Sequence, residues 1–401
     1  MENQFTIING LIVTPYEIIH NGFITVEDKK IIAIGSMSQF EYDGQVHHNL
    51  VDAHEQYVLP GIIDIHTDAL DGEIIPRPGA DIPINVAFRE LERKMNGCGY
   101  TTVYHSLHLG YKSAEHGSRS KYSRKQVFDA IYKAIKGDTL INNKIHLRFE
   151  ITGVDAYDQC IDFINNGYIE MLSVMDHTPG QGQHRKEHYI QMSVKYGKTE
   201  AQAIEDIEEK LSRPNIKGEK LQQMIDLAIQ KGIAVASHDD DTIQKIDEMQ
   251  SLGVTICEFP INMETAIYAN KQNMHVVGGA SNILRGGSLS GNLNIKDAIL
   301  NGSVTSICSD YYPPAILHSI FKLYFEHDLP LHETVKLATL NPAIAVGIDS
   351  YTGSIEIGKE ADLILVKLIE NIPIVTKSFV RGRKTLEIPH HISYNEVNNL
   401  V

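Results

Sequence analysis

Cysteine is scarce in this chain of 401 residues, and none of the four cysteines forms a CxxC pair. Cys98, Cys160, Cys257 and Cys308 stand far apart in mostly apolar surroundings. That pattern is typical of buried thiols in a reducing compartment rather than of a disulfide framework. We therefore expect a protein that does not depend on disulfides.

Long apolar segments are also missing. No uninterrupted apolar stretch reaches the roughly 18 residues that a membrane span needs. Met1 to Gly10 do not place a basic region before an apolar run, as a secretory signal would. Together with the cysteine pattern, this predicts a soluble cytoplasmic protein that does not enter a membrane.

Positive charge is in deficit: 36 Lys and Arg stand against 51 Asp and Glu, for a formal net charge of −15. This balance excludes a general nucleic-acid binder, which needs a clustered basic surface. A small phosphorylated substrate remains compatible, because a few Arg, Lys or metal ions can meet its charge locally.

The two ends of the chain have β character. Short runs rich in Ile, Val, Thr and Phe are separated by turn pairs such as Asn9-Gly10, Asn21-Gly22 and Arg381-Gly382. We expect residues 1–58 and 352–401 to form one small β-sandwich domain. Its predicted strands are Gln4–Ile8, Leu11–Thr14, Gly22–Val26, Lys30–Ile34, Ala361–Lys367 and Ile372–Val380.

The middle of the chain has a different hydrophobic pattern. Near-continuous apolar runs alternate there with helical patterns such as Thr199–Leu211 and Glu219–Ile229. Continuous runs suit parallel strands that are buried on both faces. Eight such runs predict an α/β fold, a (β/α)₈ TIM-type barrel over residues 59–351. They are Gly61–Ile65, Thr101–His105, Ile145–Ile151, Ile169–Met175, Ile233–Ser237, Val254–Phe259, His275–Gly279 and Val304–Cys308.

Metal-binding side chains stand where five of these runs end. The first run ends in two of them, and their i, i+2 spacing places both on one side of the strand. TIM barrels carry their catalytic groups at the C-terminal ends of the strands, so we predict a metal site there. Its predicted ligands are His66, Asp68, Glu150, His177, His238 and Asp310.

This mixture of imidazole and carboxylate suits Zn²⁺, with Mn²⁺ and Fe²⁺ as alternatives, better than Ca²⁺. One or two ions are compatible with it, and Glu150 is the natural bridging carboxylate of a two-ion centre. Asp310 could take the proton of a metal-bound water. Any single histidine is more simply a surface or packing residue, as we expect for His20, His54 or His146. The joint pattern over five strands favours the metal interpretation.

Two end motifs resemble those of a known superfamily. Val58–Asp68 resembles the opening signature of the amidohydrolase superfamily. Thr339–Gly347, followed by Gly353–Leu363, looks like its closing signature. The resemblance implies the superfamily's architecture, a barrel with a β-sandwich split between the termini.

A closer resemblance covers most of the chain from Val58 to Leu363. It is to the α-D-ribose 1-methylphosphonate 5-triphosphate diphosphatases of the carbon–phosphorus lyase pathway. It implies hydrolysis of a ribose 5-triphosphate to the 5-phosphate with release of pyrophosphate. The motifs that carry it are His66–Asp68, Pro76–Gly79, Met175–Gln181, Ala236–Asp240, Glu258–Pro260, Arg285–Ser288, Ser290–Asn292 and Ser309–Pro313.

The chain shows two departures. The usual HxH of the superfamily is HxD here, as the closer family predicts. Leu289 stands where that family typically carries histidine, which puts the substrate preference in question.

Phosphates need cations and amide donors, and two segments offer them. Arg77 follows the first strand between Pro76 and Pro78, although a surface salt bridge would explain it equally well. The segment after the seventh strand is rich in glycine, and TIM barrels often bind phosphate there. The predicted substrate-binding residues are Arg77, Asn282, Arg285, Gly286, Gly287 and Ser288.

The connection Thr178–Lys198 is long and basic, with His184, Arg185 and Lys186 among its residues, and is predicted to cover an anionic ligand. Two other hypotheses stay open. One is a hydrolase of C–N bonds, such as a cyclic amidase or deaminase. The other is a barrel that has lost catalysis and serves as a scaffold. A homo-oligomer is compatible with the sequence.

Overall fold

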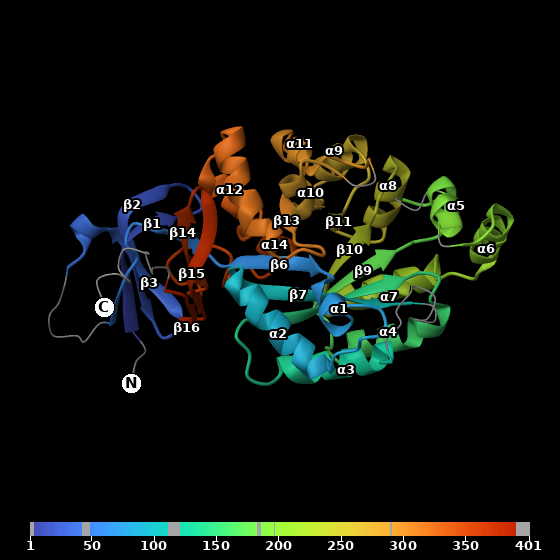
Figure 1. The fold of residues 1–401 in the computed structure, drawn as a ribbon, viewed down its shortest axis with the longest axis horizontal. Helices are drawn as coiled ribbons and strands as arrows, with labels where there is room; N and C mark the ends of the chain where they lie inside the picture. The colour runs from blue at the N-terminus through green and yellow to red at the C-terminus, as the bar shows by residue number, and fades with distance from the viewer. Residues whose placement is uncertain are drawn as a thin grey trace, which may run out of the picture.

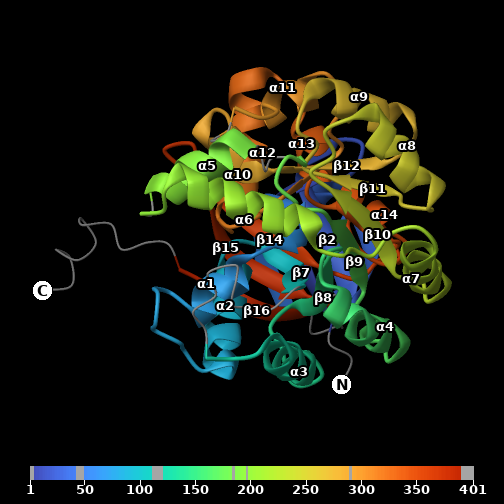
Figure 2. The same ribbon diagram turned by 90° about the vertical axis from the view of Figure 1, so that its right-hand side faces the viewer.

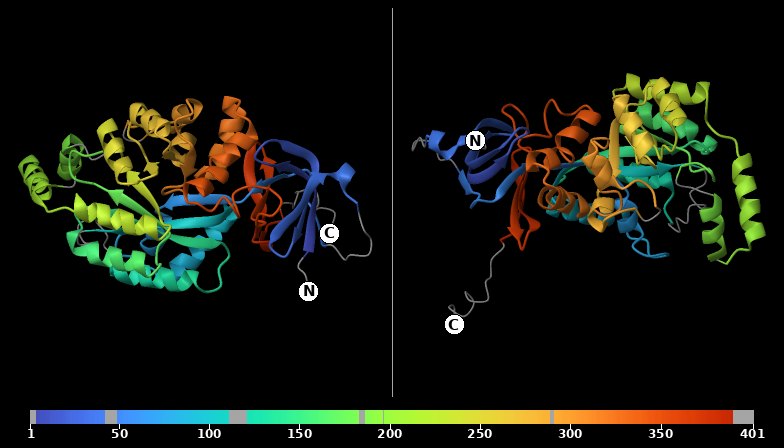
Figure 3. Two further views of the ribbon diagram at one scale, coloured as in Figure 1. Left: turned by 180° about the vertical axis from the view of Figure 1, so that it is seen from behind. Right: turned by 90° about the horizontal axis from the view of Figure 1, so that it is seen from above.

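The structure is a computed structural model of the chain, and it describes residues 4–41, 49–110, 121–182, 186–195, 197–288 and 291–389. A β-sheet domain forms one end of the molecule, and an α/β barrel forms the rest (Figure 1). Helices α5 and α6 lie at the end farthest from the sheet domain, which Figure 3 shows from two more directions.

Eight parallel strands form the barrel, in sequential order from β6 to β13. A bridge between Thr67 and Asp310 joins the first strand to the last at its C-terminal end, where the Asp68 N–H donates to the Asp310 carbonyl at 2.7 Å. All eight predicted strands are confirmed. They are β6 Ile62–Thr67, β7 Tyr100–Leu109, β8 Asn142–Glu150, β9 Met171–Met175, β10 Ala234–His238, β11 Ile256–Glu258, β12 His275–Gly279 and β13 Ser306–Cys308.

Helices surround these strands (Figure 2). Their apolar faces and the outer faces of the strands form the main core, while Ile63, Tyr104, Met171 and Val277 belong to a second core made largely by the strands. The helices are α1 Ala69–Ile74, α2 Ile84–Gly97, α3 Arg124–Ile135, α4 Tyr157–Asn165, α5 Lys186–Lys195, α6 Glu200–Ser212, α7 Glu219–Gln230, α8 Ile243–Ser251, α9 Met263–Lys271, α10 Ala280–Arg285, α11 Ile295–Leu300, α12 Ala315–His327, α13 Leu331–Lys336 and α14 Leu340–Ala345, with short 3₁₀ turns at Met37–Gln39 and Val154–Ala156.

Strands from both termini build one mostly antiparallel sheet, in the order β16-β15-β14-β5-β1-β2-β3, with β4 paired to β1. Phe5 of β1 stacks on Phe379 of β15 with ring centroids 4.9 Å apart, although β5 and β14 lie between these strands in the sheet. The sheet therefore curls around its own core. Its strands are β1 Gln4–Val13, β2 Ile18–Glu27, β3 Lys30–Ser36, β4 Asn49–Asp52, β5 Tyr57–Pro60, β14 Leu363–Ile369, β15 Ile372–Val380 and β16 Arg383–Glu387.

Local expectations differ from the structure in three respects. Asn9 and Asn21, with φ of 57° and 46°, lie within β1 and β2 and not in turns between strands, because the two strands pair on both sides of the irregularity at Gly10 and Gly22. The helical pattern of Thr199–Leu211 predicts that Ile204, Ile207 and Leu211 share one face of α6. Of these only Ile207 is buried, with Ala203, whereas Ile204 and Leu211 are exposed. The long connection after His177 contains α5, and its residues 183–185 and 196 lie outside the described ranges.

Candidate metal centre

Ligand atoms converge at the C-terminal ends of the barrel strands. Three groups of residues among those described have ligand atoms within 4.8 Å of one another. His66 and His238 each belong to two of the groups, and the donors are imidazole nitrogens and carboxylate oxygens, which together suit Zn²⁺, Mn²⁺ or Fe²⁺. The groups are His66 with Asp68 and Asp310, His177 with His238 and Asp239, and His66 with His238 and Glu258.

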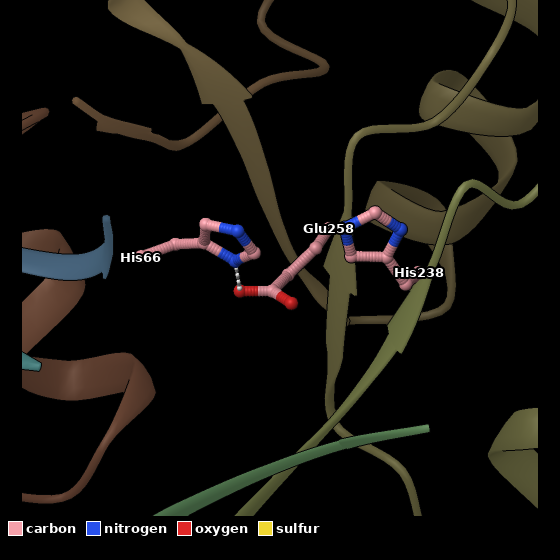
Figure 4. Close-up of side chains that lie close together, drawn as sticks. All are labelled: His66, His238 and Glu258. Carbon is pink, nitrogen blue, oxygen red and sulfur yellow. Dashed lines mark hydrogen bonds and ion pairs between the residues drawn. The ribbon is translucent and has the colours of Figure 1, made fainter. Parts of the chain in front are cut away.

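Glu258 orients His66. It reaches from the end of β11, and its Oε1 lies 2.9 Å from Nδ1 of the His66 ring (Figure 4). The carboxylate at Nδ1 leaves Nε2 of His66 facing Asp68, whose Oδ1 is 4.0 Å away. Burial is the largest single influence and lowers the pKa of His66, but the charge and hydrogen bond of Glu258, together with the charge of Asp68, raise that pKa above its usual value. A carboxylate behind an imidazole is the usual support of a metal-binding histidine.

The other oxygen of Glu258 is also engaged. The Ser173 hydroxyl donates to Oε2 at 2.5 Å, and Nε2 of His146 lies 2.5 Å from the same hydroxyl. All of these side chains are buried. Burial lowers the pKa of His146 to about 3, so its ring is neutral. His146 is thus a buried histidine behind the centre, in agreement with its prediction as a packing residue.

Arg148 of β8 lies among the ligands, with its side chain only 13% exposed. Its Nη1 donates to both oxygens of Asp68, at 2.6 and 2.8 Å, and its Nη2 is 3.5 Å from Nε2 of His238. Burial would raise the pKa of Asp68, but the nearby guanidinium lowers it below the usual range. Asp68 is therefore an anion held by a charge-assisted pair.

Asp310 differs from Asp68, because burial raises its pKa to about 6. It follows β13 with a φ of 58°, in the left-handed region that aspartate tolerates better than most residues. That backbone turns its carboxylate toward His66 and Asp68, with which it shares a ligand group. A carboxyl that titrates near neutral pH at this position is suited to accepting a proton.

Glu150 and His177 form a pair. Oε2 of Glu150 lies 3.0 Å from Nδ1 of His177, and Oε1 accepts the His177 N–H at 3.2 Å. Among the described residues, Glu150 is in none of the three ligand groups, whereas His177 shares one with His238. The structure thus places Glu150 next to His177. That Glu150 bridges two ions stays a prediction.

A cavity of about 270 Å³ opens from these ligands toward the end of β12. Arg285, Ser288 and Asn282 line it, whereas Gly286, Gly287 and Arg77 are not among its lining residues, and Arg77 is exposed. The Asn282 amide holds the backbone of Leu293 and Ile295, at 3.0 and 3.1 Å. Leu289 lies outside the described residues.

Sequence reasoning missed four residues of the centre as participants: Arg148, Asp239, Glu258 and Phe259. Arg148 precedes Glu150 by two residues on one strand, which predicts the same face. Glu258 stands one residue before the end of its predicted strand, as Glu150 does. Phe259 has a φ of 54°, unusual for a bulky residue, and its ring packs on His66 and His238 at centroid distances of 4.8 and 5.2 Å.

The chain is similar to known proteins over most of its length. The profile of the Amidohydrolase family matches residues 184–391. A curated relative from Escherichia coli (strain K12), named α-D-ribose 1-methylphosphonate 5-triphosphate diphosphatase, is 33% identical over 80% of this chain and 86% of its own length. An imidazolonepropionase from Fusobacterium nucleatum is 21% identical over 86% of this chain and 84% of its own length.

Solved structures show the same architecture. The N-acetylglucosamine-6-phosphate deacetylase of Pasteurella multocida aligns with a TM-score of 0.62 at 14% identity, covering 95% of this chain and 99% of that one. The whole arrangement of barrel and terminal sheet is therefore shared with that structure. Within the described part of the chain, none of the helices has the length and apolar character that crossing a bilayer requires.

Proposed function

We propose a function for this chain from the premise that it belongs to the amidohydrolase family, as its family match and its relative in Escherichia coli show. It is a hydrolase, and the reaction we assign to it is the metal-dependent cleavage of α-D-ribose 1-methylphosphonate 5-triphosphate. The products are the 5-phosphate and pyrophosphate. This reaction is the one named for the relative that is 33% identical to it.

One observation carries the proposal: the group His66, Asp68 and Asp310 opens into the same cavity as Arg285 and Ser288. A phosphoanhydride hydrolase needs its water-activating group next to a cation that binds phosphate oxygens. The residues to which we assign these two roles line one cavity. The surrounding Asn292 and Tyr311 add polar groups that could bind a sugar phosphate.

His66, Asp68 and Asp310 would hold a divalent ion, Zn²⁺ by preference, since their donors match its chemistry. When bound, such an ion supplies Lewis acidity and lowers the pKa of water. Glu258 holds the His66 ring so that Nε2 faces the cavity, and Arg148 keeps Asp68 ionised. The Asp310 carboxylate accepts the proton of the attacking water. Arg285, whose guanidinium lies 3.2 Å from the Tyr311 hydroxyl, binds phosphate oxygens.

A cytoplasmic setting belongs to the same proposal. All four cysteines are free, and three of them are buried. Thiols of this kind fit a reducing compartment, where a phosphorylated intermediate of phosphonate breakdown would also be found.

The test is pyrophosphate release by the purified protein after loading with Zn²⁺ or Mn²⁺. We expect release from α-D-ribose 1-methylphosphonate 5-triphosphate, much slower release from ATP, and none with the Asp310→Asn variant. A metal-loaded and folded protein that releases no pyrophosphate from the ribose triphosphate would disprove the proposal.

A second candidate is hydrolysis of a C–N bond in a small cyclic substrate. The observation that favours it is the apolar wall of the cavity, made by Phe259, Pro260 and Ile261, which suits a neutral ring. The name of the imidazolonepropionase relative points the same way. Turnover of cyclic ureides or N-acyl substrates, unaffected by Arg285→Ala, would support this candidate over the first.

A further inference from the structure

The guanidinium of Arg148 lies between two ligand groups of the metal centre. Nη1 binds Asp68, a member of the first group, and Nη2 lies at His238, a member of the second. The side chain enters from β8 and is largely buried. A fixed positive charge therefore stands inside a centre that is otherwise formed by carboxylates and imidazoles.

His238 has no nitrogen left for a metal ion while Arg148 is in place. A neutral imidazole has one N–H and one lone pair. If Nε2 accepts the Arg148 N–H at 3.5 Å, the ring proton is on Nδ1, which lies 3.3 Å from Oδ2 of Asp239. If Nδ1 instead carried the lone pair, the Nε2–H would face the N–H of Arg148, donor against donor. Neither tautomer therefore offers a lone pair to a metal ion without an unfavourable contact between two N–H donors.

Asp68 is different, because a carboxylate can serve a guanidinium and a metal ion together. Its two oxygens carry about four lone-pair sites, and one nitrogen of Arg148 uses only part of them. The Asp68 side chain is 36% exposed on the cavity side. The group of His66, Asp68 and Asp310 thus remains competent for an ion next to Arg148.

We propose that Arg148 takes the place of a second metal ion, so that the chain binds one divalent ion, at His66, Asp68 and Asp310. The group of His177, His238 and Asp239 stays free of metal because the guanidinium occupies the lone pair and supplies the charge there. This inference rests on the metal-dependent function proposed above. It goes further by fixing the number of ions and the residue that limits it.

The experiment counts the bound metal. The full-length protein is stripped with a chelator and titrated with Zn²⁺ by calorimetry, and the loaded protein is then measured by elemental analysis. We expect one equivalent for the wild type and two for Arg148→Met, which keeps the length of the side chain but removes its charge. The double variant Arg148→Met/His238→Ala should return to one.

Arg124→Met is the matched control. Arg124 is also a largely buried arginine, 17% exposed, and it pairs at 3.1 Å with Asp71, which belongs to none of the three ligand groups. It should bind one equivalent, like the wild type. Circular dichroism verifies that each variant is folded, and the wild-type count remains a test even if Arg148→Met does not fold.

Each result has a distinct meaning. Two tight equivalents in the wild type overturn this inference and leave the proposed hydrolase intact. One equivalent in a folded Arg148→Met variant, or two in the double variant, shows that Arg148 does not exclude an ion from His238. A wild type that binds no Zn²⁺ overturns the proposed function as well.

Discussion

The two ends of the barrel use carboxylates in opposite ways. Beside the first residues of β8, Glu92 of α2 is 1% exposed and accepts from the Leu140 N–H, the Asn143 amide and Arg89, at 2.8, 2.8 and 3.1 Å. At the other end, Asp68 and Asp310 face a cavity, and the cavity-facing group they form with His66 could hold a metal ion.

The difference shows that residue type alone does not mark a functional carboxylate. The carboxylate oxygens of Glu92 already accept hydrogen bonds from backbone and side-chain donors, so Glu92 has a structural role. The carboxylates of the centre keep lone pairs directed at a space that a ligand can enter. Four changes would test or sharpen this contrast.

The largest effect is expected from Asp310→Asn. Removing the proposed proton acceptor and metal ligand should lower kcat by about 1,000-fold, while the fold survives, because asparagine also tolerates the left-handed φ. Steady-state pyrophosphate release measures it. Asp328→Asn is the matched control, since Asp328 is exposed and also has a positive φ. Activity within a few-fold of the wild type for Asp310→Asn would remove Asp310 from the reaction.

Glu92→Ala should reduce stability and leave kcat of the folded fraction unchanged. Without the carboxylate, the backbone N–H groups of the half-buried Leu140 and the buried Ile141 lose their acceptor, at a cost of roughly 4 kcal/mol in all. Urea denaturation measures the free energy of unfolding. Glu90→Ala, on the exposed face of the same helix, should change it by less than about 0.5 kcal/mol. Equal effects of the two variants would contradict the structural role of Glu92.

Asp362 makes stability depend on pH. It is buried where the barrel meets the sheet, bonded by the Thr352 hydroxyl at 2.7 Å and the Arg381 N–H at 2.8 Å, and burial raises its pKa to about 6. A folded-state pKa above the unfolded value means that its contribution is fully present below about pH 4 and is lost as the pH rises through about 6.

Asp362→Asn mimics the protonated acid and should remove that dependence. We expect the variant to be more stable than the wild type at pH 8, by at most about 3 kcal/mol, and the gap to close toward pH 4. Urea unfolding at several pH values tests this. A gap that widens as the pH falls would show the opposite sign and refute the raised pKa.

The smallest effects concern the predicted phosphate-binding arginines. Arg285 lines the cavity and Arg77 does not. Arg285→Ala should therefore raise KM about tenfold by removing a charge-assisted contact, whereas Arg77→Ala should change it less than about twofold. A larger effect of Arg77→Ala would mean that its loop reaches the substrate, as the sequence predicts.

Most of the barrel was predictable, because buried parallel strands are continuous apolar runs and their ends are visible in the sequence. The same rule located His66, Asp68, His177, His238 and Asp310. It did not distinguish a residue that would bind the metal from one that orients a metal-binding side chain, since Glu258 and Glu150 end strands in the same way. Their different partners, His66 for one and His177 for the other, depend on strands far apart in the chain.

The sequence by itself determined the fold and which strand ends carry the imidazole and carboxylate side chains of the candidate metal centre, because hydrophobic periodicity and the i, i+2 alternation of strands are local properties. Only the tertiary structure decided which of these side chains contact one another. Closure of the barrel between Thr67 and Asp310 brings β6 and β13 together, and it places Arg148 of β8 against Asp68 and His238. Such distances of a few ångströms are set by the packing of the whole barrel, which no local pattern encodes.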